Sequence, residues 1–164
     1  MANSTTFVAT QMPQLRRFAR VLTGSQTVAD SYALATLEAA NAAPPFNNEA
    51  EARLWLYRAL LATWMRIEVR EAESGLIPGA KKSPFDFNLM AVAPLPRAAF
   101  LLQSMEEFQK EQVADILQQP LRDVEYLIDQ AGEELARQIS TDVLLIEDEP
   151  FISIGHVARP AKCH

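Results

Sequence analysis

The sequence predicts an all-α protein of two helical bundles, with one short orphan β-strand near the C-terminus. Apolar residues recur at helical spacing along most of the chain, and proline and glycine separate these stretches. The composition, 49% apolar and 22% charged, is typical of a folded globular protein. We therefore divide the chain into a first helical bundle (1–70), a linker (71–94), a second helical module (95–140) and a C-terminal segment (141–164).

The first bundle is predicted to contain three helices. The first covers about residues 6–22 and ends at Gly24, because glycine readily accepts the left-handed conformation. Thr27 is expected to cap the second helix, and Asn48, with a glutamate three residues later, to begin the third. The third helix is apolar over more than one face, which predicts either a bundle centre or a face left for a partner.

Three arginines on the first predicted helix form a basic group. Arg16, Arg17 and Arg20 could contact nucleic acid or simply solvate an outer face, and we favour the solvated face. Between residues 71 and 94, glycine and proline interrupt the helical pattern, which predicts a linker between two helical modules.

The second module has the outline of a helix-turn-helix. It is predicted to hold three helices joined by short turns, and Pro120 suits the first turn of the third. The apolar stripe of that third helix is Val124, Leu127, Ile128, Ala131, Leu135 and Ile139. In DNA-binding proteins of this outline, the second helix of the motif lies in the major groove. The outline alone therefore predicts a DNA-binding protein.

The charge of this third helix contradicts DNA binding. Residues 120–135 hold one base, Arg122, against five acids. The acids are Asp123, Glu125, Asp129, Glu133 and Glu134. Across residues 96–139, four bases and nine acids give a net charge of −5. Since contacts of Lys and Arg with phosphates supply most of the affinity of DNA-binding proteins, we expect no DNA binding and a fold used for another partner.

The periodicity changes after residue 139. Residues 143–146 form a short apolar run that leads into the carboxylates of Glu147, Asp148 and Glu149. This pattern is typical of a buried strand that ends at a metal site. The residues that follow are too few to complete a parallel sheet, so the strand is expected to be an orphan or a fragment of something longer.

Several function classes find no support in the sequence. No apolar run is long enough to span a membrane, and the N-terminus does not have the form of a signal peptide. The single cysteine, Cys163, fits a reducing cytoplasm. No nucleophile–base pair or glycine-rich phosphate loop indicates an enzyme. His156, Cys163 and His164 could be imagined as metal ligands, but a fourth ligand is missing and an incidental tail is the better interpretation.

Four stretches of the chain are informative because of the order in which they occur. They are LRRFARVLTGSQTVAD (15–30), WLYRALLATWMR (55–66), LPRAAFLLQSMEEFQKEQVADIL (95–117) and STDVLLIEDEPFIS (140–153). In this order they resemble the PhyR-type regulators of the bacterial general stress response. The first two are similar to the family's counterpart of region 2 of extracytoplasmic-function sigma factors. The third and the helix after it are similar to its region-4-like part, and the fourth resembles the first strand of a response-regulator receiver domain.

The resemblance implies anti-anti-sigma action by partner switching. Such a regulator mimics a sigma factor and captures a small helical anti-sigma protein of the NepR type, which frees the true sigma factor. The acidic third helix agrees with mimicry, because it keeps the fold and lacks the charge needed for DNA. The alternative is a genuine sigma factor that binds promoter DNA and RNA polymerase, and the same acidic helix counts against it.

The receiver part of the resemblance carries its own expectations. Glu147 and Asp148 would correspond to the acidic pair that binds Mg²⁺ in a complete receiver, but the acceptor aspartate lies on a later strand that is missing here. We therefore expect no phosphorylation, no metal site and no cofactor. In full-length members the receiver covers the sigma-like part, so this chain is expected to bind its partner constitutively.

Partner anchors are expected among exposed apolar residues ringed by polar ones, in a groove that receives a helix. The candidates are Leu15, Phe18, Trp64, Asp123 and Tyr126. They lie on the first and third predicted helices and on the acidic helix. The sequence alone does not separate such anchors from core residues.

Overall fold

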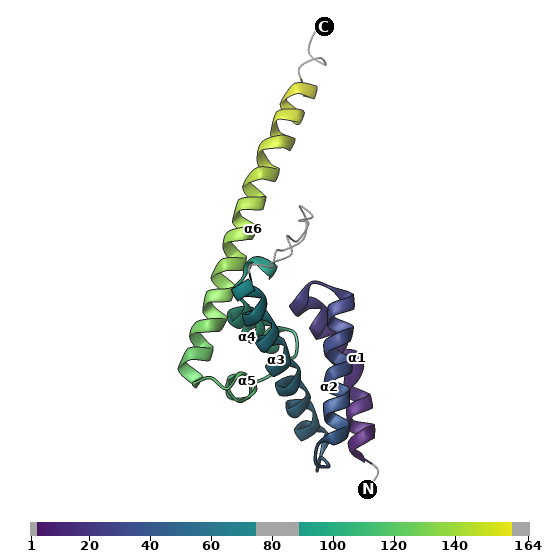
Figure 1. Ribbon diagram of the computed structural model, residues 1–164. Helices are drawn as coiled ribbons and strands as arrows, with labels where there is room; N and C mark the ends of the chain where they lie inside the picture. Colours follow the sequence, from purple (N-terminus) through teal and green to yellow (C-terminus); the bar gives the residue numbers. More distant parts are fainter. Residues whose placement is uncertain (1–2, 75–88, 159–164) are drawn as a thin grey trace.

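The computed structural model describes residues 3–74 and 89–158, with side chains from residue 4 to 68 and from 89 to 140. In these two ranges, seven helical elements follow one another (Figure 1). They are α1 (Asn3–Thr23), α2 (Gln26–Ala42), α3 (Glu49–Ser74), η1 (Leu89–Ala91), α4 (Pro94–Ser104), α5 (Lys110–Leu117) and α6 (Leu121–Ala158). The part of the chain that the structure describes is helical, which confirms the all-α prediction.

Helices α1, α2 and α3 pack against one another, as predicted for the first bundle (Figure 1). Helix α1 ends as expected, because Gly24 has a φ of +70° and donates its N–H to the carbonyl of Arg20 at 2.9 Å. The prediction that Thr27 caps α2 is wrong. The cap is Ser25, whose extended backbone precedes the helix and whose hydroxyl accepts from the N–H of Val28. Thr27 already lies inside the first turn.

The start of α3 has a capping arrangement close to the predicted one. Asn48 Oδ1 accepts from the N–H of Glu51 at 2.8 Å, as predicted. The carboxylate of Glu51 accepts in return from the N–H of Asn47 at 2.9 Å, one residue earlier than in the usual capping box. Together these bonds satisfy two backbone donors at the helix terminus.

Helices α4, α5 and α6 form the second module, and α5 and α6 enclose the tight turn of the predicted helix-turn-helix. Gln109 and Gln112 form a capping box at the start of α5, and Gln118 ends it in the left-handed conformation, with a φ of 55°. Pro120 lies just before α6 rather than in its first turn, and its carbonyl accepts from the N–H groups of Asp123 and Val124.

The predicted β-strand at residues 143–146 is wrong. The structure continues α6 through these residues to Ala158. A lone strand leaves its backbone N–H and C=O groups without partners, whereas a helix satisfies them within one segment. The apolar run therefore joins the helix that precedes it, and no strand occurs among the described residues.

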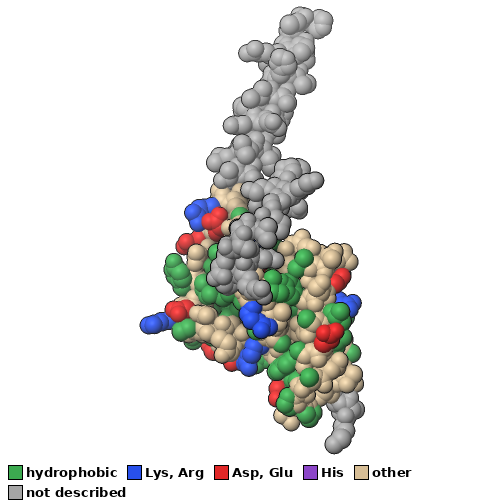
Figure 2. Space-filling view, in the orientation of Figure 1, with side chains coloured by type: hydrophobic (Ala, Val, Ile, Leu, Met, Phe, Trp, Pro, Cys, Tyr) green, Lys and Arg blue, Asp and Glu red, His purple; other side chains and the backbone are tan. Residues whose placement is uncertain are grey.

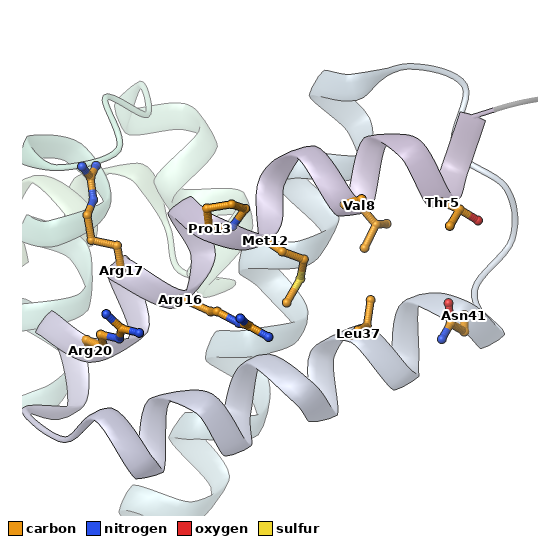
Figure 3. A pocket seen from close by; sticks show the side chains of 10 residues that line it. Thr5, Val8, Met12, Pro13, Arg16, Arg17, Arg20, Leu37 and Asn41 are labelled. Atoms are coloured by element: carbon orange, nitrogen blue, oxygen red, sulfur yellow. The ribbon is translucent and has the colours of Figure 1, made fainter.

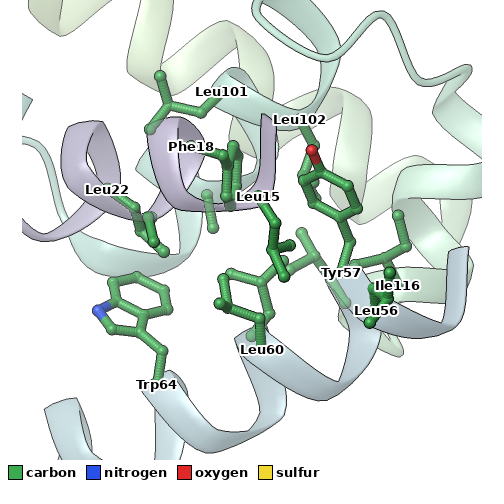
Figure 4. Close-up of a cluster of buried hydrophobic side chains, with 14 of the residues drawn as sticks. Leu15, Phe18, Leu22, Leu56, Tyr57, Leu60, Trp64, Leu101, Leu102 and Ile116 are labelled. Carbon is green, nitrogen blue, oxygen red and sulfur yellow. The ribbon is translucent and has the colours of Figure 1, made fainter. Parts of the chain in front are cut away.

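One core extends through both modules. Buried side chains of α1 and α3 continue without a break into those of α4, α5 and α6 (Figure 4). Its largest fully buried members are Trp64, Tyr57, Phe18, Leu15, Leu22, Leu56, Leu60, Leu61, Leu102, Val113 and Val124. The first residues of the predicted linker 71–94 belong to α3. Its last residues form η1 and the start of α4, and residues 75–88 lie outside the described residues.

Candidate partner-binding site

Three of the five predicted anchors are core residues. Leu15 and Phe18 on α1 are 0% exposed and Trp64 on α3 is 1% exposed. Figure 4 shows these side chains in the space between α1 and α3. The expectation that their side chains stay uncovered is therefore wrong, because the wide apolar surface of α3 is covered by α1 and by the second module. Their helical spacing fits a core stripe and a binding stripe equally well.

Trp64 belongs to a polar network that connects α3 to α4. Its indole N–H donates to Glu68 Oε1 at 3.1 Å, and Arg97 Nη2 lies 3.6 Å from the same oxygen. The guanidinium of Arg97, 2% exposed, also lies over the Trp64 ring and donates to the carbonyls of Leu89 and Val92. Burial lowers the pKa of Arg97, and the charge of Glu68 opposes that shift. The network holds the first module against the second.

A second buried cluster joins α3 to the turn between α4 and α5. The hydroxyl of Tyr57 donates to Glu106 Oε2 at 2.7 Å, and Arg53 lies 3.5 Å from the same oxygen. The guanidinium of Arg53 also lies 4.1 Å from the centre of the Phe108 ring. Burial, and then the hydrogen bond to Glu106, raise the pKa of Tyr57 far above its ordinary value. At the surface nearby, Arg58 pairs with Asp115.

The two remaining predicted anchors lie on the exposed face of α6. Tyr126 is 67% exposed, and the side chain of Asp123 is 51% exposed. Most of the acidic residues predicted to face solvent do so, and acidic side chains lie along the α6 edge of the molecule in Figure 2. This face therefore offers an aromatic ring among carboxylates.

The few bases near this face are already paired. Arg122 Nε lies 3.8 Å from Asp123 Oδ1, and Lys110 Nζ lies 3.4 Å from Glu125 Oε1. Further along α6, Arg137 pairs with Glu134 at 2.6 Å. Because their nearest neighbours are carboxylates, these bases provide little positive potential for phosphates. The predicted lack of charge for DNA is thus strengthened by the ion pairs.

A groove between α1 and α2 is a second candidate surface, which sequence reasoning missed (Figure 3). Val8 of α1 and Leu37 of α2 point toward each other across it, and Thr5 and Asn41 lie at one end. The other end is lined by Arg16, Arg17 and Arg20. The signal in the sequence is a row at four-residue spacing on α1, apolar at positions 8 and 12 and basic at 16 and 20. Which helix faces that row could not be read from the sequence.

The predicted metal and receiver residues receive no structural test. Glu147, Asp148 and His156 lie in the part of α6 whose side chains are not described, and Cys163 and His164 lie outside the described residues. Among the side chains that are described, no group of three or more His, Cys, Asp or Glu residues is placed to hold a metal ion. None of the described helices is long and apolar enough to cross a membrane.

A three-helix bundle packed on a helix-turn-helix module defines a protein of the sigma-factor-like class. The fold is shared by the sigma factor RpoE of Bartonella quintana, solved in complex with the anti-sigma factor NepR. That chain is 20% identical, with a TM-score of 0.68 over 87% of this chain and 99% of that one. At this identity, the likeness concerns the fold alone.

More specific matches identify the family. The model of the sigma2 domain of PhyR matches residues 8–61, and the model of the sigma-like domain of the response regulator PhyR matches residues 89–138. The NMR structure of the PhyRSL–NepR complex from Sphingomonas sp. Fr1 is 33% identical, with a TM-score of 0.65 over 84% of this chain and 89% of that one. The chain belongs to the PhyR family.

Comparison with a longer relative shows how much of such a protein this chain covers. The phyllosphere-induced regulator PhyR of Methylorubrum extorquens is 36% identical over 148 residues, which cover 90% of this chain and 54% of that protein. The chain therefore spans about half the length of the curated relative it matches. The division at residues 70, 94 and 140 stays a prediction.

Proposed function

We propose that this chain is an anti-anti-sigma factor, which mimics a sigma factor and sequesters a small helical anti-sigma protein of the NepR type. Relatives support the proposal, because solved PhyR structures from Bartonella quintana and Sphingomonas sp. Fr1 hold NepR as the bound partner. The sigma factor fold of the same class is also found bound to NepR. A mimic needs the fold that the anti-sigma protein recognises.

One observation separates a mimic from a genuine sigma factor. The helix α6 that would enter the major groove has exposed acids, and its neighbouring bases Arg122 and Lys110 form ion pairs with Asp123 and Glu125. Binding DNA would bring these carboxylates toward phosphates and break the ion pairs. The fold is kept while the DNA-binding surface is lost, which favours capture of a protein.

The test is a calorimetric titration of this chain with the NepR-type protein of its own organism. We expect a one-to-one complex with a Kd below about 1 μM. In a competition experiment, the chain should displace the true sigma factor from that complex. Labelled promoter DNA should show no shift at moderate salt. No binding to the NepR-type protein, together with specific promoter binding, would establish a sigma factor instead.

Further parts of the proposal follow from the same role. Sequestration requires no chemical step, so we propose no catalysis, no metal and no cofactor for this chain. The acidic pair Glu147 and Asp148 is not assigned a function here. The expected location is the cytoplasm, where RNA polymerase and its sigma factors work. The full-length family architecture makes a receiver domain a second expected partner of the sigma-like part.

A further inference from the structure

The exposed face of α6 carries a short row of side chains in a fixed order. Tyr126, Asp129 and Glu133 follow one another at spacings of three and four residues, so they lie on the same side of the helix. All three are exposed, and neither acid forms an ion pair or a side-chain hydrogen bond with another described residue. This acidic row therefore presents one aromatic ring followed by two carboxylates that no described base neutralises.

A row of similar length and opposite charge lies on α1. Met12, Arg16 and Arg20 are four residues apart, and the first two lie on the side of α1 that faces α2 (Figure 3). Met12 is half-buried and lines the same groove as Leu37 of α2, whereas the two arginines are exposed. Neither arginine forms an ion pair or a side-chain hydrogen bond with another described residue. This basic row therefore presents an apolar patch followed by two unpaired guanidinium groups.

The charges of the two rows favour one direction of alignment. At a rise of about 1.5 Å per residue, the acidic row spans about 10 Å of helix and the basic row about 12 Å. With the two helices parallel, Tyr126 meets Met12 and each carboxylate meets a guanidinium group. Arg122, one turn before Tyr126, then lies toward the end of the groove that the neutral residues Thr5 and Asn41 line. The antiparallel alignment would place Arg122 beside the arginines of α1, where like charges repel.

The two rows lie too far apart to meet within one chain. Helices α1 and α2 pack on α3, while α6 packs on α4 and α5, so the rows lie on opposite sides of the molecule (Figure 1). The charge of the whole chain has the same polarity. Residues 1–66 hold six bases and four acids, a net charge of +2, against −5 for residues 96–139. The basic part of one copy therefore attracts the acidic part of another.

We propose that the exposed face of α6 in one copy binds the α1–α2 groove of a second copy. The Tyr126 ring packs on Met12, and Asp129 and Glu133 pair with the two exposed arginines of the basic row. Because the contact joins two different surfaces, each copy keeps one of each, and association can continue beyond two copies. The contact is small and charged, so we expect a Kd on the order of 100 μM at low salt. This self-association involves no other protein and is independent of the proposed function.

Charge reversal on either surface tests the contact in the full chain. Sedimentation velocity over a range of concentrations measures self-association of the double variants Arg16→Glu/Arg20→Glu and Asp129→Lys/Glu133→Lys. We expect each variant alone to weaken self-association by about tenfold or more, because like charges then face each other. An equimolar mixture of the two variants should associate within about threefold of the unmodified chain, since each basic surface again meets an acidic one. High salt should weaken the association of the unmodified chain.

The control variant is Arg66→Glu/Glu111→Lys, which reverses exposed charges on α3 and α5 outside both rows and should associate like the unmodified chain. An unmodified chain that stays monomeric up to about 1 mM would overturn the proposal. So would self-association that the reversals leave unchanged, or a mixture that does not recover. Oligonucleotide binding that depends on Arg16 and Arg20 in a monomeric chain would assign the basic row to nucleic acid instead. Circular dichroism melts establish that each variant remains folded.

Discussion

The most unusual single residue for stability is Tyr57. Its hydroxyl is buried and donates to a buried carboxylate, so the neutral phenol is strongly favoured in the folded state. In the unfolded chain its pKa returns to the ordinary value of 10.0. Because the folded pKa is raised, the stabilising contribution is complete below pH 10 and is lost progressively as the pH rises above it.

The upward shift of the Tyr57 pKa can be tested at alkaline pH. We expect the free energy of unfolding to fall steeply above about pH 10, and Tyr57→Phe to flatten that decline. At pH 7 the same variant should lose about 1–2 kcal/mol, because Glu106 loses a donor. Urea denaturation from pH 7 to 11 measures both effects. Tyr126→Phe, a change at an exposed tyrosine, is the control, and an equal flattening there would contradict the assignment.

Arg97 is the second residue whose burial has a measurable consequence. Arg97→Met keeps most of the apolar length but leaves Glu68 without its cation and two carbonyls, those of Leu89 and Val92, without a donor. We expect a loss of about 2–3 kcal/mol in the free energy of unfolding, measured by urea titration. Arg66→Met, at an exposed arginine, should change it by less than about 0.5 kcal/mol. Equal losses would show that the buried network contributes little.

Among the elements, the helices were predictable and their orientation was not. Capping signals and spacing located the helix ends to within a few residues, as at Gly24 and Asn48, because these depend on local chemistry. The prediction of a strand at 143–146 was wrong because a short apolar run that follows a helix fits either a strand or a continuation of the helix. Leu15 and Phe18 failed as exposed anchors because spacing shows a stripe, and the packing partner decides whether that stripe is covered.

Helix α6 carries the predicted anchors that did remain exposed. Since Tyr126 is 67% exposed, Tyr126→Ala should leave the free energy of unfolding within about 0.5 kcal/mol. If the ring inserts into the partner, the affinity for the NepR-type protein should fall about tenfold or more. Calorimetry provides the affinity and thermal melts provide the stability. Gln130→Ala, another exposed position on α6, should change neither, and an unchanged affinity for Tyr126→Ala would remove this residue from the site.

At the scale of the whole molecule, the sequence indicated two modules but not how they meet. The charge difference between the modules is visible in the sequence and predicted the acidic face of α6. The ion pairs on that face became visible only in the structure. The contact between the modules could not be read, because it depends on pairs far apart in the chain, such as Tyr57 with Glu106 and Trp64 with Arg97. The groove between α1 and α2 could not be predicted from the sequence for the same reason.

The continuous core predicts that both modules unfold together. Phe108, 3% exposed in the turn between α4 and α5, packs against Tyr57 of α3 with ring centres 5.1 Å apart. Phe108→Ala should cost about 3 kcal/mol. This variant should lower the urea midpoint seen by tryptophan fluorescence by as much as the midpoint seen by circular dichroism. Fluorescence reports only α3, through Trp55 and Trp64, whereas circular dichroism reports all helices.

The contrary result is easy to recognise in the same urea titrations. If the modules unfold independently, the unmodified chain will give different midpoints for the two signals, and Phe108→Ala will leave the fluorescence midpoint unchanged. Tyr126→Ala, which touches no part of this contact, should move neither midpoint. Coincident shifts would mean that the two modules unfold as one unit, so that the α1–α2 groove and the exposed face of α6 belong to one cooperatively folded body.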